Sequence, residues 1–186
     1  MSLWRHTATM LENSKNLNNQ AVRLASKGEY EDAIACLKRA ITVENSNYLL
    51  WFNLGLTYHD AGKIYLAKSA MEHAHRINPY DEDTLDSLAL FCLSAKSFDE
   101  AMLYCAKGLE LNPANPHYWN TSGVIRFQQG NYAEAAELFE HAVSLSPHYY
   151  DALFNLRDTY EELKNKAGVQ ECTRMLKSIK EADQQF

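Results

Sequence analysis

Hydrophobic residues along 51–58 recur every three or four positions, which is typical of one face of an α-helix. Gly62 follows and is expected to end this helix, because glycine readily adopts the backbone conformation found just after a helix. Along 64–77, small and apolar residues again fall on one side, which predicts a second helix. Asn78 and Pro79 end it, since proline disfavours helical backbone in the residue before it. The stretch therefore predicts a helical hairpin.

This hairpin pattern returns along the chain with a fixed period of 34 residues, so that Trp51 and Trp119 lie two periods apart. Five consecutive repeats follow one another without insertions, and the match weakens in the fifth. Asp81, Asn115 and Ser146 stand near the starts of later helices, where their side chains can cap free amides. A fixed period of roughly 20–50 residues indicates an array in which each repeat buries its apolar face against its neighbours.

One position in the first helix of each repeat holds a small residue. Gly55 occupies it in the second repeat, although glycine in mid-helix costs about 1 kcal/mol relative to alanine. We expect close packing of the two helices of a hairpin to offset this cost. Arg157 takes the position in the fifth repeat, so the last hairpin is expected to pack differently and to form a polar cap. The small first-helix residues are Ala21, Gly55, Ala89 and Gly123, and the facing residues expected in the second helices are Ala33, Ala67, Ala101 and Ala135.

The repeat resembles the tetratricopeptide repeat (TPR), whose pattern is W-x2-L-G-x2-Y, then A-x3-F, then P. In the second repeat this pattern reads Trp51, Leu54, Gly55, Tyr58, Ala67, Met71 and Pro79. The resemblance covers 14–183, as units 14–47, 48–81, 82–115 and 116–149 and a degenerate unit 150–183, and leaves 1–13 as an amino-terminal extension or capping segment. It implies an all-α fold, a right-handed α-solenoid of stacked antiparallel helical hairpins (the TPR superhelix), with the first helices lining a concave groove.

Composition and charge narrow the class of protein. Hydrophobic residues make up 46% of the chain and charged residues 23%, which is typical of a globular protein. The net charge of −6 argues against nucleic-acid binding, which needs a basic patch, and against an anionic membrane surface. No apolar run approaches the roughly 18 residues of a membrane span, and the first residues lack the apolar core of a signal peptide. We therefore expect a cytoplasmic protein with single buried thiols, because its four cysteines form no CxxC pair.

The polar residues form no recognisable catalytic or metal-binding motif. His59 and His117 are expected to face the groove, but neither has a Cys or Ser partner at a suitable spacing. His73 and His75 lie two residues apart and therefore diverge on a helix, whereas a metal site needs three or four converging ligands. We expect no enzyme activity, no catalytic residue, no metal and no cofactor.

Three features of the predicted groove indicate that it binds another protein or a peptide. Apolar residues form a line, amide side chains recur at one position, and the third and fifth repeats supply five carboxylates and no cation. The alternatives are that the apolar line packs between repeats, that asparagine is simply common at its position, and that the carboxylates form a solvated face. The candidate groove residues are Asn19, Phe52, Asn53, Leu56, Asp83, Asp86, Leu90, Asn120, Val124, Phe127, Phe154 and Asn155.

The chemistry of these residues predicts the kind of partner. An asparagine side chain can donate to and accept from a peptide backbone at once, and the carboxylates favour a partner with apolar anchors and basic flanks. A subclass of the family grips the carboxylate tails of heat-shock chaperones with a Lys/Arg/Asn clamp, but the matching positions here retain only Asn53. We therefore expect a non-enzymatic interaction scaffold that does not bind such tails.

Two alternative functions remain open. One is a self-associating structural scaffold, a homo-oligomer, in which the stretch 3–13 with Trp4, Met10 and Leu11 docks on its own first unit or on a neighbour. The other is the TPR part of a larger enzyme or assembly factor.

Overall fold

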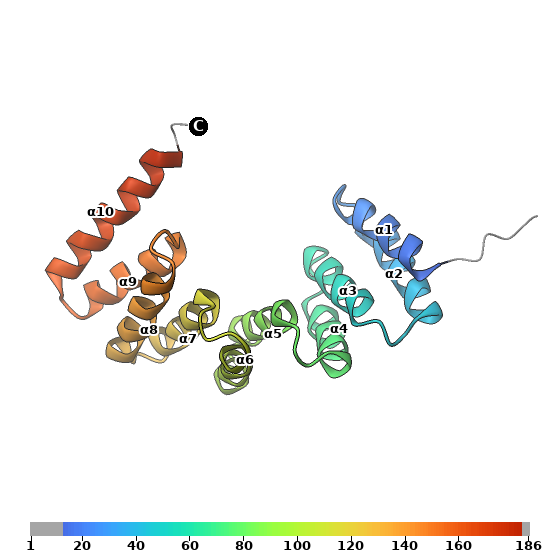
Figure 1. The fold of residues 1–186 in the computed structure, drawn as a ribbon, viewed down its shortest axis with the longest axis horizontal. Coiled ribbons are helices and arrows are strands. Elements are labelled where there is room, and N and C mark those ends of the chain that lie inside the picture. Colours follow the sequence, from blue (N-terminus) through green and yellow to red (C-terminus); the bar gives the residue numbers. More distant parts are fainter. Residues whose placement is uncertain (1–12, 184–186) are drawn as a thin grey trace, which may run out of the picture. The chain divides into compact units, whose positions relative to one another are not determined.

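The computed structural model of the chain describes residues 13–183, which form ten α-helices and contain no β-strand. The predicted all-α fold of repeated hairpins is therefore confirmed (Figure 1). The stretch 1–12, which carries Trp4, Met10 and Leu11, lies outside the described residues. The helices are α1 (Ser14–Ala25), α2 (Tyr30–Val43), α3 (Tyr48–Asp60), α4 (Ile64–Ile77), α5 (Glu82–Ser94), α6 (Phe98–Leu111), α7 (Pro116–Gln128), α8 (Tyr132–Leu145), α9 (Tyr150–Glu162) and α10 (Lys166–Asp183).

Consecutive helices pack against each other in pairs. α1 packs against α2 and α3 against α4, while α7 packs against α8 and α9 against α10. Further contacts join α2 to α3, α6 to α7 and α8 to α9, so neighbouring hairpins cover one another's apolar sides. The chain divides into two compact units: unit 1 ends at Thr84, and unit 2 begins at Leu85, within α5.

A residue with left-handed backbone ends the first helix of every hairpin. At each of these turns, two backbone N–H groups donate to carbonyl groups of the last helical turn. Carbonyl groups that the helix itself leaves without a partner are thereby hydrogen-bonded. The turn predicted at Gly62 is therefore confirmed. The residues with positive φ, between 57° and 80°, are Gly28, Gly62, Lys96, Gly130 and Lys164, each 34 residues after the last.

Glycine brings the two helices of a hairpin into close contact, as expected. A Cβ atom at Gly55 would lie 2.9 Å from side-chain carbons of Met71, and one at Gly123 would lie 2.6 Å from the Phe139 ring. Met71 lies nearest to Gly55, and Ala67, about one helical turn earlier on α4, is fully buried.

The fifth hairpin packs differently from the others, as the position of Arg157 predicts. The Arg157 guanidinium group lies over the Phe154 ring, 4.3 Å from its centroid. A close approach between α9 and α10 occurs instead at Gly168, where a Cβ atom would lie 2.5 Å from the Tyr160 ring. In the fifth hairpin, the small residue that allows the close approach therefore lies on the second helix and not on the first.

Polar side chains replace apolar ones on α10. Val143 of α8 packs against the cluster that includes Leu156 of the next hairpin. One period later the same position holds Lys177, whose side chain is 76% exposed and lies 3.6 Å from Glu181. The last helix therefore offers no apolar contact at this position, which is consistent with the expected polar cap.

Asparagine or aspartate caps most first helices. Asn47 and Asn115 accept hydrogen bonds from the backbone N–H groups two residues ahead, and Asp81 accepts one from the residue three ahead. The predicted cap at Ser146 is wrong, because Ser146 directly follows α8. Helix α9 instead begins after Tyr149, whose side chain makes no capping hydrogen bond.

The described residues offer neither a membrane span nor a metal cluster. None of their helices is both long and apolar enough to cross a bilayer. No group of three or more His, Cys, Asp and Glu side chains in 13–183 is placed to hold a metal ion. The four cysteines are buried and free, and burial raises the pKa of the Cys105 thiol to about 11, so this thiol is protonated at neutral pH.

Replacing Gly123 by leucine is expected to destabilise the protein by more than about 2 kcal/mol, because the new side chain must overlap the buried Phe139 ring. Shortening Phe139 to alanine in the same chain should recover part of this loss. Urea unfolding of the two single variants and the double variant measures the coupling between the two sites. Purely additive effects would show that these residues do not limit the approach of the helices.

The left-handed turns offer a reciprocal pair of variants. Lys96→Gly is expected to stabilise the protein by about 1 kcal/mol, because this conformation is costly for lysine and not for glycine. Gly62→Lys is expected to destabilise it by a similar amount, and the open space around Gly62 excludes a clash as the cause. Thermal unfolding tests both variants, and melting temperatures that move in the same direction would contradict the explanation.

Candidate functional site

Amide side chains join neighbouring first helices in both units. In unit 1, Asn53 Nδ2 of α3 donates to Asn18 Oδ1 of α1 at 2.8 Å. In unit 2, Asn155 Nδ2 of α9 donates to Asn120 Oδ1 of α7 at 3.0 Å. Asn19, the first member of the predicted amide series, is exposed. The amides therefore form two clasps between helices, and each donor still has a side-chain carbonyl to offer to a ligand.

The clasp in unit 2 extends into a longer polar chain. Asn120 is buried and donates to Tyr149 Oη at 3.5 Å, and this oxygen lies 3.0 Å from His117 Nδ1. Burial, with a smaller effect from the Asp151 carboxylate, raises the pKa of Tyr149 to about 12, so the phenol is neutral. Sequence reasoning missed Tyr149. Its signal is the position before the first helix, where the other four repeats have Asn or Asp.

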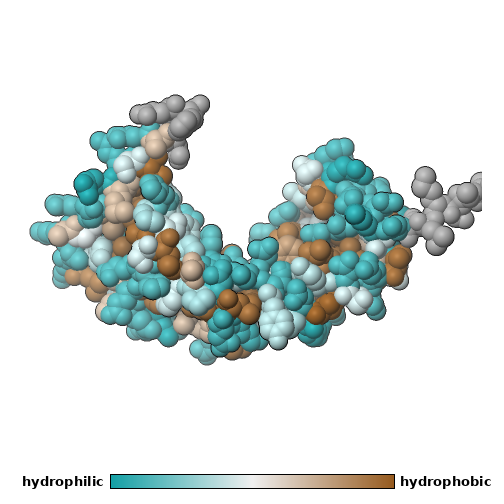
Figure 2. Space-filling view, in the orientation of Figure 1, coloured by the Kyte–Doolittle hydropathy of each residue, from teal (hydrophilic) through white to brown (hydrophobic). Residues whose placement is uncertain are grey.

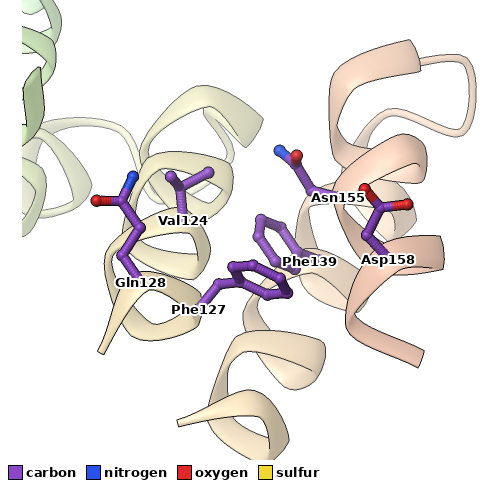
Figure 3. Close-up of a pocket in the computed structure, with 6 residues that line it drawn as sticks. All are labelled: Val124, Phe127, Gln128, Phe139, Asn155 and Asp158. Atoms are coloured by element: carbon purple, nitrogen blue, oxygen red, sulfur yellow. The ribbon is translucent and has the colours of Figure 1, made fainter. Parts of the chain in front are cut away.

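A pocket of about 180 Å³ opens between α7 and α9 in unit 2, and we call it the α7–α9 pocket (Figure 3). The Phe127 and Phe139 rings lie between the two helices, with Val124 on the α7 side. The Asn155 amide and the Asp158 carboxylate project from α9. The pocket therefore combines an aromatic base with polar groups along one edge. Its lining residues are Val124, Phe127, Gln128, Phe139, Asn155 and Asp158.

The α7–α9 pocket brings together three of the candidate groove residues, Val124, Phe127 and Asn155, with Asp158, one of the five predicted carboxylates. Phe139 and Gln128 were not among the predicted site residues. Phe139 stands in the F position of the repeat pattern and is 1% exposed, so its periodicity indicates the core and not a binding surface. Gln128 carries no periodic signal at all.

One acidic residue at the pocket edge already has a cationic partner. Arg157 Nη2 lies 2.6 Å from Asp158 Oδ1, while the guanidinium group covers the Phe154 ring. The prediction that the fifth repeat brings only carboxylates to this surface needs correction, because Arg157 adds a cation. Asp151 and Glu161 on the same helix are exposed.

The remaining candidate groove residues lie on both units. Their exposed fractions reach 40% for Leu56 in unit 1 and 46% for Leu90 in unit 2. Hydrophobic side chains accordingly reach the otherwise largely hydrophilic surface of both units (Figure 2). Exposed among the candidates are Leu56, Asp83, Leu90 and Phe154, whereas Phe52 and Asp86 are half-buried.

His73 and His141 lie two periods apart, at the same position of the second helix, and both have a structural role. The His73 ring stacks on Trp51 with centroids 4.4 Å apart, and the His141 ring lies 4.1 Å from Trp119. Each indole N–H also donates to a backbone carbonyl six residues earlier, at 2.9 Å and 2.8 Å. Each histidine therefore packs against the tryptophan of its own hairpin.

Comparison with known families agrees with this architecture. Family profiles described as TPR repeat or tetratricopeptide repeat match residues 23–62, 48–81 and 126–185. The chain belongs to the tetratricopeptide repeat family. A TPR repeat-containing protein of Methanocaldococcus jannaschii is 23% identical over 187 residues, which cover 91% of this chain and 33% of that relative. The chain spans between 8% and 39% of the length of the curated relatives it matches.

Solved structures share the fold of this TPR protein. MamA superimposes with a TM-score of 0.80 at 17% identity, covering 89% of this chain and 97% of MamA. YrrB, described as a TPR protein with an unusual peptide-binding site, superimposes with a TM-score of 0.71 at 23% identity, covering 90% of this chain and 86% of YrrB. The fold of this TPR protein indicates a scaffold for protein–protein interaction.

Asn120→Ala is expected to destabilise the protein by about 1–3 kcal/mol, because it removes the partner of Asn155 and a donor to Tyr149 at a buried position. Asn19→Ala is the matched control and should change the free energy of unfolding by less than about 0.5 kcal/mol, since Asn19 is exposed. Urea unfolding measures both, and equal effects would mean that the clasp does not stabilise unit 2.

Proposed function

We propose that this TPR protein binds a peptide segment of another protein on its first helices, and that the α7–α9 pocket takes an apolar side chain of that segment. The proposal depends on one observation, the convergence of two aromatic rings with the Asn155 amide and the Asp158 carboxylate in a single pocket. An apolar cavity with a few polar groups at its edge is the usual form of a binding site.

The anchor in the α7–α9 pocket supplies most of the affinity in this proposal, because a few desolvated contacts dominate the energy of most interfaces. Asn155 then orients the ligand. Its Nδ2 donates to Asn120, while its Oδ1 can accept a backbone N–H of the peptide. The clasp holds this amide in place before binding, so less conformational freedom is lost when the peptide arrives.

Charge near the pocket favours a peptide with Lys or Arg beside its anchor. Asp158 lines the pocket, and Asp151 and Glu161 are exposed on the same helix. A basic ligand residue competes with Arg157 for Asp158, so we expect the charges to act mainly on the association rate. Salt weakens this effect over a Debye length of about 8–10 Å.

Each unit carries further groove candidates, and we propose that they contact a peptide bound to that unit. Asn53 presents its side-chain carbonyl as Asn155 does, and Leu56 offers an exposed apolar side chain. The likeness to YrrB supports a peptide ligand, and TPR proteins generally serve as scaffolds and not as enzymes. Further candidates for these contacts are Asn19, Phe52, Asp83, Asp86, Leu90 and Phe154.

Peptides with aliphatic or aromatic anchors and basic flanks are expected to bind the full chain. Phe127→Ala should speed dissociation by about tenfold or more, through loss of the anchor contact. Asp158→Lys should slow association at low salt, and the difference should shrink as salt is raised. Surface-based kinetics at two salt concentrations measures both rates.

Leu103→Ala is the control for these measurements, because Leu103 is 53% exposed on α6 and does not line the α7–α9 pocket. Melting curves establish that each variant is folded. A peptide ending in a chaperone-type acidic tail should not bind, since the clamp positions retain only Asn53 and carry no Lys or Arg. Unchanged dissociation from Phe127→Ala would contradict the proposal, and so would a preference for acidic flanks among the peptides whose binding depends on Phe127.

A further inference from the structure

Unit 1 contains a second apolar pocket, on different helices. It lies between α2 and α4 with α3 as its floor, encloses about 370 Å³, and is called here the α2–α4 pocket. Ile41, Trp51 and Tyr58 contribute apolar and aromatic surface, and Leu66 at the edge is 49% exposed. None of the predicted groove residues lines it.

The aromatic wall of this pocket is held rigidly. Trp51 donates its indole N–H to the Asn45 carbonyl at 2.9 Å and stacks on His73 with an angle of 16° between the rings. His73 Nδ1 in turn lies 3.0 Å from the Ser69 carbonyl of the preceding helical turn. A wall fixed in this way loses little conformational freedom when a ligand packs against it.

The charge of the α2–α4 pocket is positive. Lys38 lines it and no Asp or Glu does. Lys38 Nζ lies 5.9 Å from the Tyr58 ring centroid, and within residues 13–183 no salt bridge joins this ammonium group to a carboxylate. An ammonium group over an aromatic ring beside apolar surface is a suitable partner for a ligand carboxylate.

The same positions two periods later show that the pocket is not a general property of the repeat. The tryptophan–histidine pair is kept as Trp119 and His141. Arg126 and Glu134, however, stand in the positions of Tyr58 and Leu66, and Arg126 Nε lies 2.9 Å from Glu134 Oε1. The position of Lys38 holds Ala106. An ion pair thus replaces the apolar edge in unit 2, and the cation of the pocket is lost.

We propose that the α2–α4 pocket docks a segment of a second partner protein, one with a leucine or aromatic anchor and a neighbouring Asp or Glu. The anchor packs against Trp51 and Leu66, and the carboxylate pairs with Lys38. This site goes beyond the peptide site on the first helices, because it opens between two second helices, is lined by none of the predicted groove residues and selects the opposite charge. The scaffold then holds two partners of different chemistry at the same time.

Random 12-residue peptides displayed on phage provide the probe. They are selected against the full chain, and enriched peptides are synthesised for affinity measurement. We expect one class with apolar anchors and acidic neighbours, whose Kd rises at least about tenfold with Leu66→Glu, which copies Glu134, and with Lys38→Glu. Leu103→Glu on α6 is the control for a new surface charge, and Phe127→Ala is the control for the α7–α9 pocket.

This experiment tests the proposals for the two pockets independently. Absence of any peptide class sensitive to both Leu66 and Lys38 overturns the α2–α4 proposal, whatever happens at Phe127. Basic neighbours in the Leu66-sensitive class overturn it as well. If sedimentation shows self-association that Leu66→Glu abolishes, a second copy of the chain is the occupant. If Trp4→Asp uncovers peptide binding that the natural chain lacks, the amino-terminal segment is the occupant, and either result overturns the proposal.

Discussion

The close approach of paired helices is the contact on which the rest of this structure depends. Gly55 and Gly123 present no side chain to the second helix, so Met71 and Phe139 can fill the space between the helices. Tertiary packing of this kind supplies most of the stability of short helices, which is why a residue of poor helix propensity is tolerated there. A turn with left-handed backbone recurs every 34 residues and joins the two helices of each hairpin in the same way. The second helix of one hairpin can then pack against the first helix of the next.

The same packing decides which polar groups are left for a partner. A buried amide must be hydrogen-bonded, and Asn120 meets this need through Asn155 and Tyr149. Asn155 therefore donates one hydrogen bond within the protein through Nδ2, and its side-chain carbonyl oxygen remains available to a ligand. Asp158 is likewise shared with Arg157. The polar groups proposed to bind a ligand in the α7–α9 pocket thus belong to side chains that structural hydrogen bonds and an ion pair already hold in place.

Departures from the repeat, more than the repeat itself, give each pocket its chemistry. The tryptophan–histidine pair occurs in both units, yet only unit 1 has Lys38 and Leu66 where unit 2 has Ala106 and Glu134. On the first helices the charge is mainly acidic, whereas the α2–α4 pocket carries a cation. A repeat array can vary such surface positions freely, because its stability rests on the small and apolar positions that recur. The two proposed partners match these charges, since a basic segment suits the acidic first helices and an acidic segment suits the α2–α4 pocket.

The sequence by itself determined the hairpin array, the turn at Gly62 and the small residues at the helix contacts, because these follow from backbone conformation and helical periodicity. It also indicated Phe127 and Asn155 as surface residues of the first helices. Only the tertiary structure decided that Phe139, a core residue by its periodicity, forms the base of a pocket, and that Asp158 is paired with Arg157. Periodicity assigns a residue to a face of its own helix. Pockets, clasps and ion pairs depend instead on distances between side chains of different helices, which are set when the helices pack.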